Sequence, residues 1–287
     1  MMSSCWQVIF FSDGGIDEKT ETFLSDYFEV LAQNYDDAGN DEYVGYCSGE
    51  LDEEKMLIAS REAKVILPKY KIEKLESDNW LKDYVIKFAP FEVEDFMIYG
   101  IHESQAPQTQ KIALQIYAAT AFGSDHQTTR SCLKAICELY HQQYVPAKIL
   151  DVGTGSGILS LAAASLWKDT KIIAVDIDEE AVLVTQSNAQ NNNLDNKIQV
   201  AQSDGYQAEI VKQNAKYDLI LANILARPLT EMATSAAASL KKGGFIILSG
   251  FVEEQFEWVI EEHQKCGLEL VKTYELDNWR AVVMKKE

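Results

Sequence analysis

Residues 148–159 have the sequence Lys148-Ile149-Leu150-Asp151-Val152-Gly153-Thr154-Gly155-Ser156-Gly157-Ile158-Leu159. The apolar residues before the first glycine predict a short buried strand, and the residues after the third glycine predict the first turn of a helix. Glycine lets a backbone turn tightly and approach a ligand where a Cβ would clash. The free amide groups at the start of the helix would point at whatever lies over the turn. This stretch therefore predicts a strand, a ligand-binding turn and a helix.

A second apolar strand is predicted at 172–175, and it ends in Asp176, nineteen residues after Gly157. In nucleotide-type sites a carboxylate at the tip of the second strand holds a ribose diol. The turn and Asp176 together predict a site for a cofactor that contains a nucleoside. Gly153, Gly155 and Asp176 are the first candidate binding residues.

The glycine spacing distinguishes between two such cofactors. The chain has D-x-G-x-G-x-G, whereas the dinucleotide fingerprint is G-x-G-x-x-G, whose third glycine would fall at Ile158. A pyrophosphate is repelled by a facing carboxylate such as Asp151, whereas the ammonium and sulfonium groups of S-adenosylmethionine are attracted to one. The spacing favours S-adenosylmethionine, and a nicotinamide-dependent oxidoreductase is the disfavoured alternative.

Length and composition set broad limits on the class of protein. The 287 residues suffice for one large domain or two moderate ones, and a hydrophobic fraction of 47% supports a sizeable core. No apolar run approaches the length of a membrane-spanning helix, and the apolar patch at 6–11 lacks the basic flank of a signal peptide. The five cysteines are scattered and lack zinc-ligand spacing. We therefore expect a cytoplasmic protein with reduced cysteines, no metal site and no membrane segment.

The net charge of −19 is concentrated near the N-terminus. Residues 1–60 contain fourteen Asp or Glu and two lysines, a net of −12. Such a surface repels phosphate backbones, which argues against direct nucleic-acid binding, and it attracts a lysine-rich protein. A solvated face that promotes solubility is the alternative explanation.

The first 75 residues predict a small domain of their own. Apolar spacing indicates strands at 6–11, 30–35, 42–47 and 70–75, and helices at 16–28 and 52–63. The order β-α-β-β-α-β is that of a ferredoxin-like α+β domain. Because no cluster of residues in it suggests chemistry, we interpret residues 1–75 as an acidic substrate-recognition domain.

Residues 76–90 predict a linker, and residues 91–287 predict an α/β catalytic domain. Its expected strands are 93–99, 112–117, 198–201, 217–221, 245–248, 268–274 and 280–284, and its expected helices are 131–140, 179–192, 228–240 and 253–266. Alternating strands and helices predict a doubly wound parallel sheet, and the last two strands have no room for a crossover helix, so they must pair antiparallel. Such a closing hairpin is typical of methyltransferases rather than dehydrogenases.

Polar residues follow the third and fourth strands of this predicted sheet, where ligands lie in such folds. Asp204 can accept a hydrogen bond from an adenine amino group, or it can simply begin the turn with Gly205. Asn223 opens the run Asn223-Ile224-Leu225-Ala226, and its amide can both accept from and donate to a substrate nitrogen. A helix cap is the alternative for Asn223.

A polar loop precedes the predicted helix at 131–140. It contains Phe122-Gly123-Ser124-Asp125-His126-Gln127-Thr128-Thr129. A lone His126 is more often an ordinary loop residue than a catalyst, and Thr128 or Thr129 can cap the helix.

Four motifs together resemble the ribosomal protein L11 methyltransferase (PrmA) family. They are D-V-G-T-G-S-G-I-L at 151–159, V-D-I-D at 175–178, A-N-I-L-A at 222–226, and a strand ending in S-G at 249–250. The order of a small α/β domain, a linker and a class I methyltransferase domain is also similar, so the resemblance covers nearly the full length. Family members carry F-G-T-G-x-H-x-T-T before the first strand. This chain is one residue shorter there and has Asp125 where a glycine is usual.

The resemblance implies that Thr129, Gly153, Asp176 and Asn223 contact S-adenosylmethionine, that Gly155 lines the same turn, and that Asn223 is the catalytic residue. It implies methylation of amino groups, on lysine side chains or the N-terminal amine, of ribosomal protein L11. The basic substrate would dock on the acidic N-terminal domain of a monomeric enzyme. Two alternatives keep the cofactor site: a methyltransferase of another basic protein or a small amine, and a non-catalytic S-adenosylmethionine-binding protein.

Overall fold

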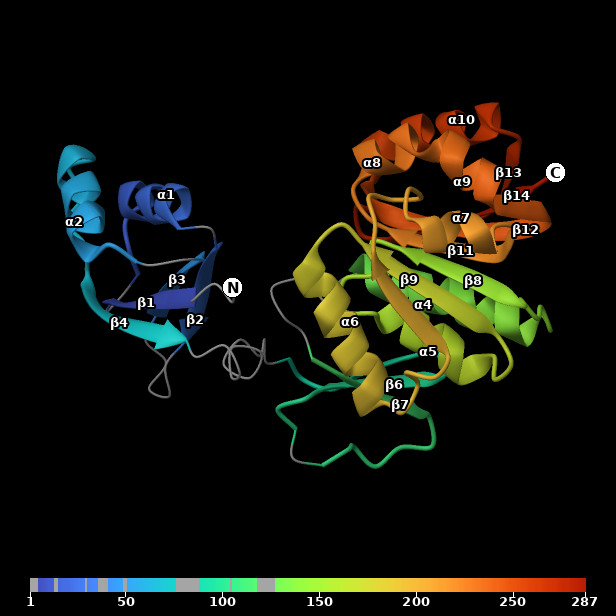
Figure 1. Ribbon diagram of the computed structural model, residues 1–287, viewed down its shortest axis with the longest axis horizontal. Helices are drawn as coiled ribbons and strands as arrows, with labels where there is room; N and C mark the ends of the chain where they lie inside the picture. Colours follow the sequence, from blue (N-terminus) through green and yellow to red (C-terminus); the bar gives the residue numbers. More distant parts are fainter. Residues whose placement is uncertain are drawn as a thin grey trace. The chain divides into compact units, whose positions relative to one another are not determined.

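The computed structural model describes residues 5–12, 15–28, 30–35, 41–48, 51–75, 88–103, 105–117 and 127–287 (Figure 1). The chain divides into two compact units, residues 1–84 and 85–287. Residues 76–87 of the predicted linker and residues 122–126 of the polar loop lie outside the described residues. None of the helices within the described ranges is long and apolar enough to cross a membrane.

The described residues of the N-terminal unit form a four-stranded antiparallel sheet and two helices. Its elements are β1 (Cys5–Ser12), α1 (Glu18–Tyr27), β2 (Val30–Tyr35), β3 (Asp41–Ser48), α2 (Glu53–Glu62) and β4 (Lys69–Leu75). The strand order β2-β3-β1-β4 places the first strand inside the sheet. This element order and this strand order are those of a ferredoxin-like fold.

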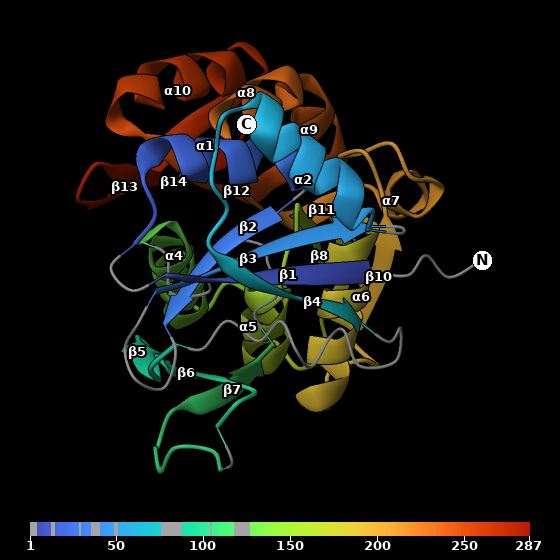
Figure 2. The same cartoon turned by 90° about the vertical axis from the view of Figure 1, so that its left-hand side faces the viewer.

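Both helices of this unit cover the same face of its sheet (Figures 1 and 2). Phe10, Leu24 and Met56 lie between the layers and are completely buried. Burial of these apolar side chains stabilises the small unit, because removing apolar surface from water is favourable.

Two of the acidic residues in this unit have a structural role at helix N-termini. The carboxylate of Asp17 accepts a hydrogen bond from the backbone N–H of Thr20 at 2.8 Å, and that of Asp52 accepts from Lys55 N–H at 3.1 Å. The hydrogen bond from Thr20 N–H holds the pKa of Asp17 below its usual value, whereas the pKa of Asp52 is lowered first by the Lys55 ammonium at 3.0 Å and then by the Lys55 backbone N–H. Asp17 and Asp52 therefore cap α1 and α2, as acidic residues at helix starts commonly do.

The C-terminal unit is built on a seven-stranded sheet of order β10-β9-β8-β11-β12-β14-β13. Its strands are β8 (Lys148–Val152), β9 (Lys171–Asp176), β10 (Ile198–Gln202), β11 (Tyr217–Asn223), β12 (Leu240–Val252), β13 (Leu268–Leu276) and β14 (Trp279–Lys286). Strands β8 to β12 pair in parallel, and β14 pairs antiparallel with both β12 and β13. The predicted doubly wound sheet with an antiparallel closing hairpin is confirmed.

Helices cover both faces of this sheet. One layer contains α4 (Gln127–His141), α5 (Ile158–Leu166) and α6 (Glu179–Asn191), and the other contains α7 (Glu209–Asn214), α8 (Ala226–Glu231), α9 (Ala233–Ser239) and α10 (Phe256–Lys265) (Figure 1). Neighbouring residues of one strand serve different layers, since Ile149 belongs to the first core and Leu150 to the second. Burial on both faces explains why the inner strands β8, β9 and β11 consist mainly of apolar residues.

A separate three-stranded sheet precedes α4. β5 (Phe91–Val93) and β6 (Phe96–Gly100) form an antiparallel hairpin, and β7 (Ile112–Ile116) runs parallel to β6. The prediction of one strand at 93–99 was wrong, because the chain turns between β5 and β6 at Glu94, which has a φ of 45°.

Two predicted helix boundaries also differ from the structure. α4 begins at Gln127 rather than at residue 131, so Thr128 and Thr129 lie buried inside its first turn and do not cap it. The predicted helix 228–240 is divided at Met232 into α8 and α9, and β12 begins directly after α9. The predicted strand 245–248 is longer in the structure, because β12 also includes residues 240–244 and 249–252.

Candidate functional site

The glycine-rich turn after β8 requires its glycines. Gly153, Gly155 and Gly157 have φ angles of 70°, 55° and 78°, a region in which residues with a Cβ are strained. A Cβ on Gly153 would lie 2.2 Å from Cγ2 of Ile224, which follows β11. The turn therefore brings the end of β8 into close contact with the end of β11.

Hydrogen bonds tie the same turn to the end of β9. The backbone N–H of Gly153 donates to the carbonyl of Val175 at 2.8 Å, and Gly155 N–H donates to Oδ2 of Asp176 at 2.9 Å. The other carboxylate oxygen of Asp176 accepts from Asp178 N–H at 3.1 Å. Because a carboxylate has about four lone-pair sites, Asp176 keeps acceptor capacity for a ribose diol.

Asp151 is turned into the protein, where it is 1% exposed. Its Oδ2 accepts hydrogen bonds from Oγ of Ser160 at 2.6 Å and from Oγ1 of Thr154 at 2.9 Å. Burial raises the pKa of Asp151 to about 6 despite these hydrogen bonds. The prediction that Asp151 faces a bound sulfonium was wrong. Its carboxylate is buried and stabilises the turn through its hydrogen bonds to Thr154 and Ser160.

Asn223 is the last residue of β11, and its Nδ2 donates a hydrogen bond to Oγ1 of Thr129 at 3.3 Å. Helix α8 has Leu225 as its N-cap residue, so the helix-cap alternative for Asn223 is wrong. Within the described part of the chain, no residue donates a hydrogen bond to Oδ1 of Asn223. That oxygen can therefore accept a hydrogen bond from a ligand.

The five predicted site residues converge at the point where the strand order reverses. β8 pairs with β9 on one edge and with β11 on the other, and ligands of doubly wound sheets bind beyond the carboxyl ends at this point. The residues form two hydrogen-bonded groups beside the turn: Gly155 with Asp176, and Asn223 with Thr129. Gly153 contacts the residue that follows Asn223.

Asp204 and His126 are two further residues that the sequence brought into consideration. Asp204 is exposed in the turn after β10, where its backbone carbonyl accepts from Gln207 N–H at 3.1 Å. Asp204 thus forms the turn, as its alternative predicted, and its hydrogen bond to an adenine amino group stays a prediction. His126 lies outside the described residues.

Gly250 contributes to the site without having been predicted to do so. It has a φ of 95°, and a Cβ there would lie 2.1 Å from the carbonyl oxygen of Ile224. The backbone N–H of Ile224 also donates to the carbonyl of Ser249 at 3.0 Å. Ile224 is thus held between Gly153 and Gly250, and the S-G pair at 249–250 was the signal that could have revealed this.

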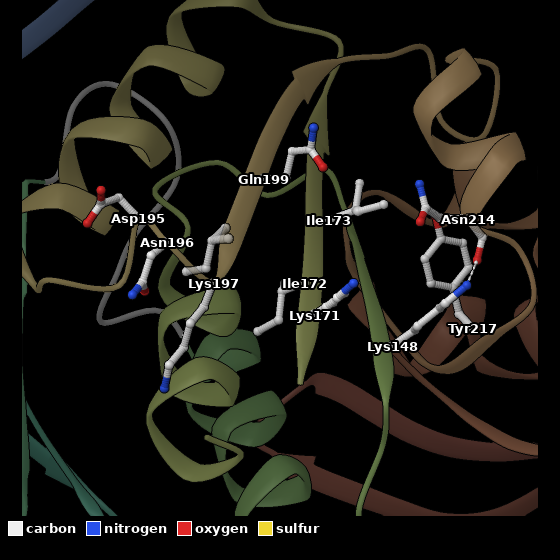
Figure 3. A pocket seen from close by; sticks show the side chains of 11 residues that line it. Lys148, Lys171, Ile172, Ile173, Asp195, Asn196, Lys197, Gln199, Asn214 and Tyr217 are labelled. Atoms are coloured by element: carbon white, nitrogen blue, oxygen red, sulfur yellow. Dashed lines mark hydrogen bonds between the residues drawn. The ribbon is translucent and has the colours of Figure 1, made fainter. Parts of the chain in front are cut away.

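A cavity of about 430 Å³ lies at the opposite end of the sheet, at the amino ends of β8 to β11 (Figure 3). Three lysines, Lys148, Lys171 and Lys197, help to line it. Nζ of Lys148 donates to the carbonyl of Asn214, the last residue of α7, and Nζ of Lys197 donates to the carbonyl of Ala164 in the last turn of α5, each at 3.1 Å.

The position of these two lysines follows from the direction of the helices. Helices that cross between parallel strands end near the amino ends of the strands, where their free carbonyls carry partial negative charge. Lys148 and Lys197 satisfy such carbonyls, so their presence needs no ligand. The cavity is therefore not the candidate active site, which lies at the carboxyl ends.

The strand order and the glycine-rich turn after β8 define a class I methyltransferase domain, together with the carboxylate that ends β9 and the asparagine that ends β11. The family model for ribosomal protein L11 methyltransferase (PrmA) matches residues 15–287. The chain belongs to this family.

Individual relatives agree with the family match. A protein of Brucella suis named ribosomal protein L11 methyltransferase is 32% identical over 269 residues, which cover 90% of this chain and 94% of the relative. Its namesake from Rhodopseudomonas palustris is 30% identical over 237 residues, 82% of this chain and 80% of the relative. The crystal structure of a ribosomal protein L11 methylase from Lactobacillus delbrueckii subsp. bulgaricus superposes with a TM-score of 0.59 at 24% identity. The superposition covers 67% of this chain and 94% of the Lactobacillus protein, and it supports the assignment of the fold.

Proposed function

We propose that this methyltransferase transfers methyl groups from S-adenosylmethionine to amino groups of ribosomal protein L11, on lysine side chains or the N-terminal amine. The observation that carries the proposal is the convergence of the glycine-rich turn, Asp176 and Asn223 at the switch point of a chain that belongs to this family. The relatives named above carry L11 as their substrate in their names.

The residues present fit S-adenosylmethionine. Gly155 leaves open backbone, with no described atom within 4 Å of the position that a Cβ would take, whereas Gly153 lets Ile224 pack against the turn. Asp176 keeps lone pairs for the ribose hydroxyls. Thr129 is buried beside Asn223 and fixes the orientation of its amide. When bound, S-adenosylmethionine supplies an activated methyl group on a positively charged sulfur.

The chain's own contribution to the reaction is to position a neutral amine. A lysine amine has a reference pKa of about 10.4 and must lose its proton before it can act as a nucleophile. Entry into a dry site lowers that pKa, because burial disfavours the charged form. Oδ1 of Asn223 and the backbone carbonyls of Ile224 and Leu225 would orient the amine nitrogen, and such orientation accounts for much of the rate in reactions of this kind.

The acidic N-terminal unit is proposed to hold the basic substrate. Glu21, Glu54 and Glu62 on its two helices are exposed, so their charges face the solvent. A positively charged protein is attracted to such a surface, and complementary charge speeds association more than it raises affinity. A ribosomal protein substrate also agrees with the expectation of a cytoplasmic enzyme.

Intact-mass spectrometry of unmethylated L11 tests the proposal. After incubation with the full chain and S-adenosylmethionine, we expect mass gains in methyl steps, and gains at least about a hundredfold slower with the Asn223→Ala variant. A wild-type chain that binds S-adenosylmethionine but leaves the mass of L11 unchanged would refute L11 as the substrate. The same assay on other basic proteins and on small amines would then separate the two alternatives that keep the cofactor site.

A further inference from the structure

Helix α6 carries buried polar side chains on the side that faces the glycine-rich turn. Thr185 and Asn188 are both completely buried. Buried polar groups are costly unless their hydrogen bonds are satisfied, so the partners of these two side chains show what the structure uses them for.

Asn188 joins the turn to strand β7 through three hydrogen bonds. Its Nδ2 donates to the carbonyl of Ser156 at 2.8 Å and to that of Tyr117 at 3.0 Å, and its Oδ1 accepts from Tyr117 N–H at 2.7 Å. Tyr117 directly follows β7, whereas Ser156 lies in the turn. A single side chain therefore sets the distance between two backbone segments that are 39 residues apart in sequence.

Thr185, three residues earlier in α6, holds the neighbouring peptide of the turn. Its Oγ1 donates to the carbonyl of Gly155 at 2.9 Å. Its methyl group lies 2.9 Å from the position that a Cβ on Gly157 would take, so it also fills the space left by that glycine. Thr185 and Asn188 together fix the carbonyls of two consecutive turn residues.

Fixing these carbonyls also aims the amide groups of the turn. A trans peptide is planar, so its N–H points away from its C=O. Because the carbonyl of Gly155 points toward α6, the N–H of Ser156 points away from that helix. Of the described residues, none accepts a hydrogen bond from Ser156 N–H, whereas Gly155 N–H is bonded to Asp176 and Gly157 N–H to Thr154. Ser156 N–H is thus a donor that the fold orients and leaves available.

We propose that Thr185 and Asn188 are positioning residues that hold the glycine-rich turn in its cofactor-binding conformation and aim Ser156 N–H at the bound S-adenosylmethionine. The proposal rests on the proposed function of the turn. Neither side chain needs to touch the cofactor, because each acts through a backbone carbonyl.

Asn192 provides a matched control for Asn188. As the C-cap residue of α6, it makes the same kind of paired contact with β7: Oδ1 accepts from Gln115 N–H at 2.9 Å and Nδ2 donates to the Gln115 carbonyl at 2.7 Å. Among the residues that the structure describes, its side chain bonds to Gln115 and Asn188 and not to the turn. A purely structural role predicts that Asn188→Ala and Asn192→Ala act alike, whereas a positioning role predicts that they differ in cofactor affinity.

The test measures the Kd for S-adenosylmethionine by isothermal titration calorimetry and the Tm of the full chain for four variants. Because small misplacements of a binding group can cost up to about a hundredfold, we expect Thr185→Val and Asn188→Ala to raise Kd at least about tenfold. Thr185→Ser keeps the hydroxyl, so its Kd should stay within about twofold of the wild-type value. The Kd of Asn192→Ala should also stay within about twofold, although this variant has a lower Tm.

Equal Kd values for Thr185→Val and Thr185→Ser would overturn the proposal, as would equal effects of Asn188→Ala and Asn192→Ala on Kd. If Asn188→Ala does not fold, the two Thr185 variants decide, since valine matches threonine in size. A wild-type chain that does not bind S-adenosylmethionine would refute the proposed function instead. These outcomes distinguish failure of the inference from failure of the function on which it rests.

Discussion

The two ends of the seven-stranded sheet are chemically opposite, although the same strands and helices build both. At the carboxyl ends lie the glycine-rich turn, Asp176 and Asn223, and helices α5, α6 and α8 begin there. At the amino ends lie the cavity of Figure 3 and the lysines bonded to helix C-termini. The difference follows from chain direction and the helix dipole, so the presence of a cavity does not by itself locate an active site.

The largest expected effect is at Asn223. Replacement by alanine should lower methyl transfer about a hundredfold to a thousandfold, the usual cost of losing one preorganised polar group at a reacting centre. Stability should change little, since the side chain loses only a long hydrogen bond to Thr129. Steady-state turnover with L11, together with circular dichroism of the variant, checks both statements. Unchanged turnover would remove Asn223 from the reaction.

A pH-dependent effect is expected at Asp151, beneath the turn. Its pKa is raised from 3.8 to about 6 in the folded protein. Because the folded value is the higher one, Asp151 favours folding most at low pH, and this contribution is lost as pH rises through about 6. The free energy of unfolding of Asp151→Asn, relative to that of wild type, should therefore rise by on the order of 2 kcal/mol between pH 4 and pH 7. Urea unfolding at the two pH values measures it, and a pH-independent difference would contradict the role of burial.

Glycine substitutions at the carboxyl and amino ends of the seven-stranded sheet test whether only the carboxyl ends bind the cofactor. Gly153→Ala places a Cβ 2.2 Å from Cγ2 of Ile224, whereas Gly243, at the amino end of β12, has a φ of 76° and no described atom within 4 Å of the position that a Cβ would take. Both changes should cost about 1–2 kcal/mol of stability through their positive φ. Only Gly153→Ala should weaken S-adenosylmethionine binding, by about tenfold or more, because it shifts the turn. Calorimetry on both variants tests this, and equal losses of affinity would break the comparison.

Charge reversal tests the proposal that the N-terminal unit binds the protein substrate and the C-terminal unit binds the cofactor. The triple variant Glu21→Lys, Glu54→Lys, Glu62→Lys should raise KM for L11 by about fivefold at low salt and leave the Kd for S-adenosylmethionine unchanged. The control reverses three exposed acids of the C-terminal unit, Glu257, Glu261 and Glu269. An equal rise of KM in both triple variants would mean that net charge, rather than the N-terminal surface, attracts the substrate.

The smallest effect is expected at the amino end of the sheet. Lys148→Met removes the donor to the carbonyl of Asn214 and should cost about 0.3–1 kcal/mol of stability, the usual value of a cation at a helix C-terminus. Turnover and cofactor affinity should stay at wild-type values. A marked loss of either would show that the lysine-lined cavity takes part in function.

Much of this fold could be predicted because its determinants are local. The glycine-rich turn identified the first strand and helix, and alternating apolar segments predicted the doubly wound sheet. Asp176 and Asn223 could be placed at one edge because the carboxyl ends of parallel strands meet there. The first residue of α4 could not be predicted, because Thr128 and Thr129 are both acceptable helix caps and only packing determines where the helix begins.

Other features depend on contacts that sequence spacing does not reveal. Asn188 bonds to residues 32 and 71 positions away. Ile224 is held between Gly153 of the glycine-rich turn and Gly250 of β12. Residues 241–244 extend β12 beyond the predicted strand 245–248 but lie at an irregularity in its pairing: β12 pairs with β11 at Leu240 and again from Phe245, where its pairing with β14 also begins.

A crystal structure of the chain with S-adenosylhomocysteine, the demethylated product of the cofactor, would test the location of the site most directly. We expect electron density for this ligand at the carboxyl ends of β8, β9 and β11, with the ribose hydroxyls on Asp176 and the glycine-rich turn beside the amino-acid portion. Density in the lysine-lined cavity at the amino ends, with the carboxyl ends empty, would contradict the assignment of the site.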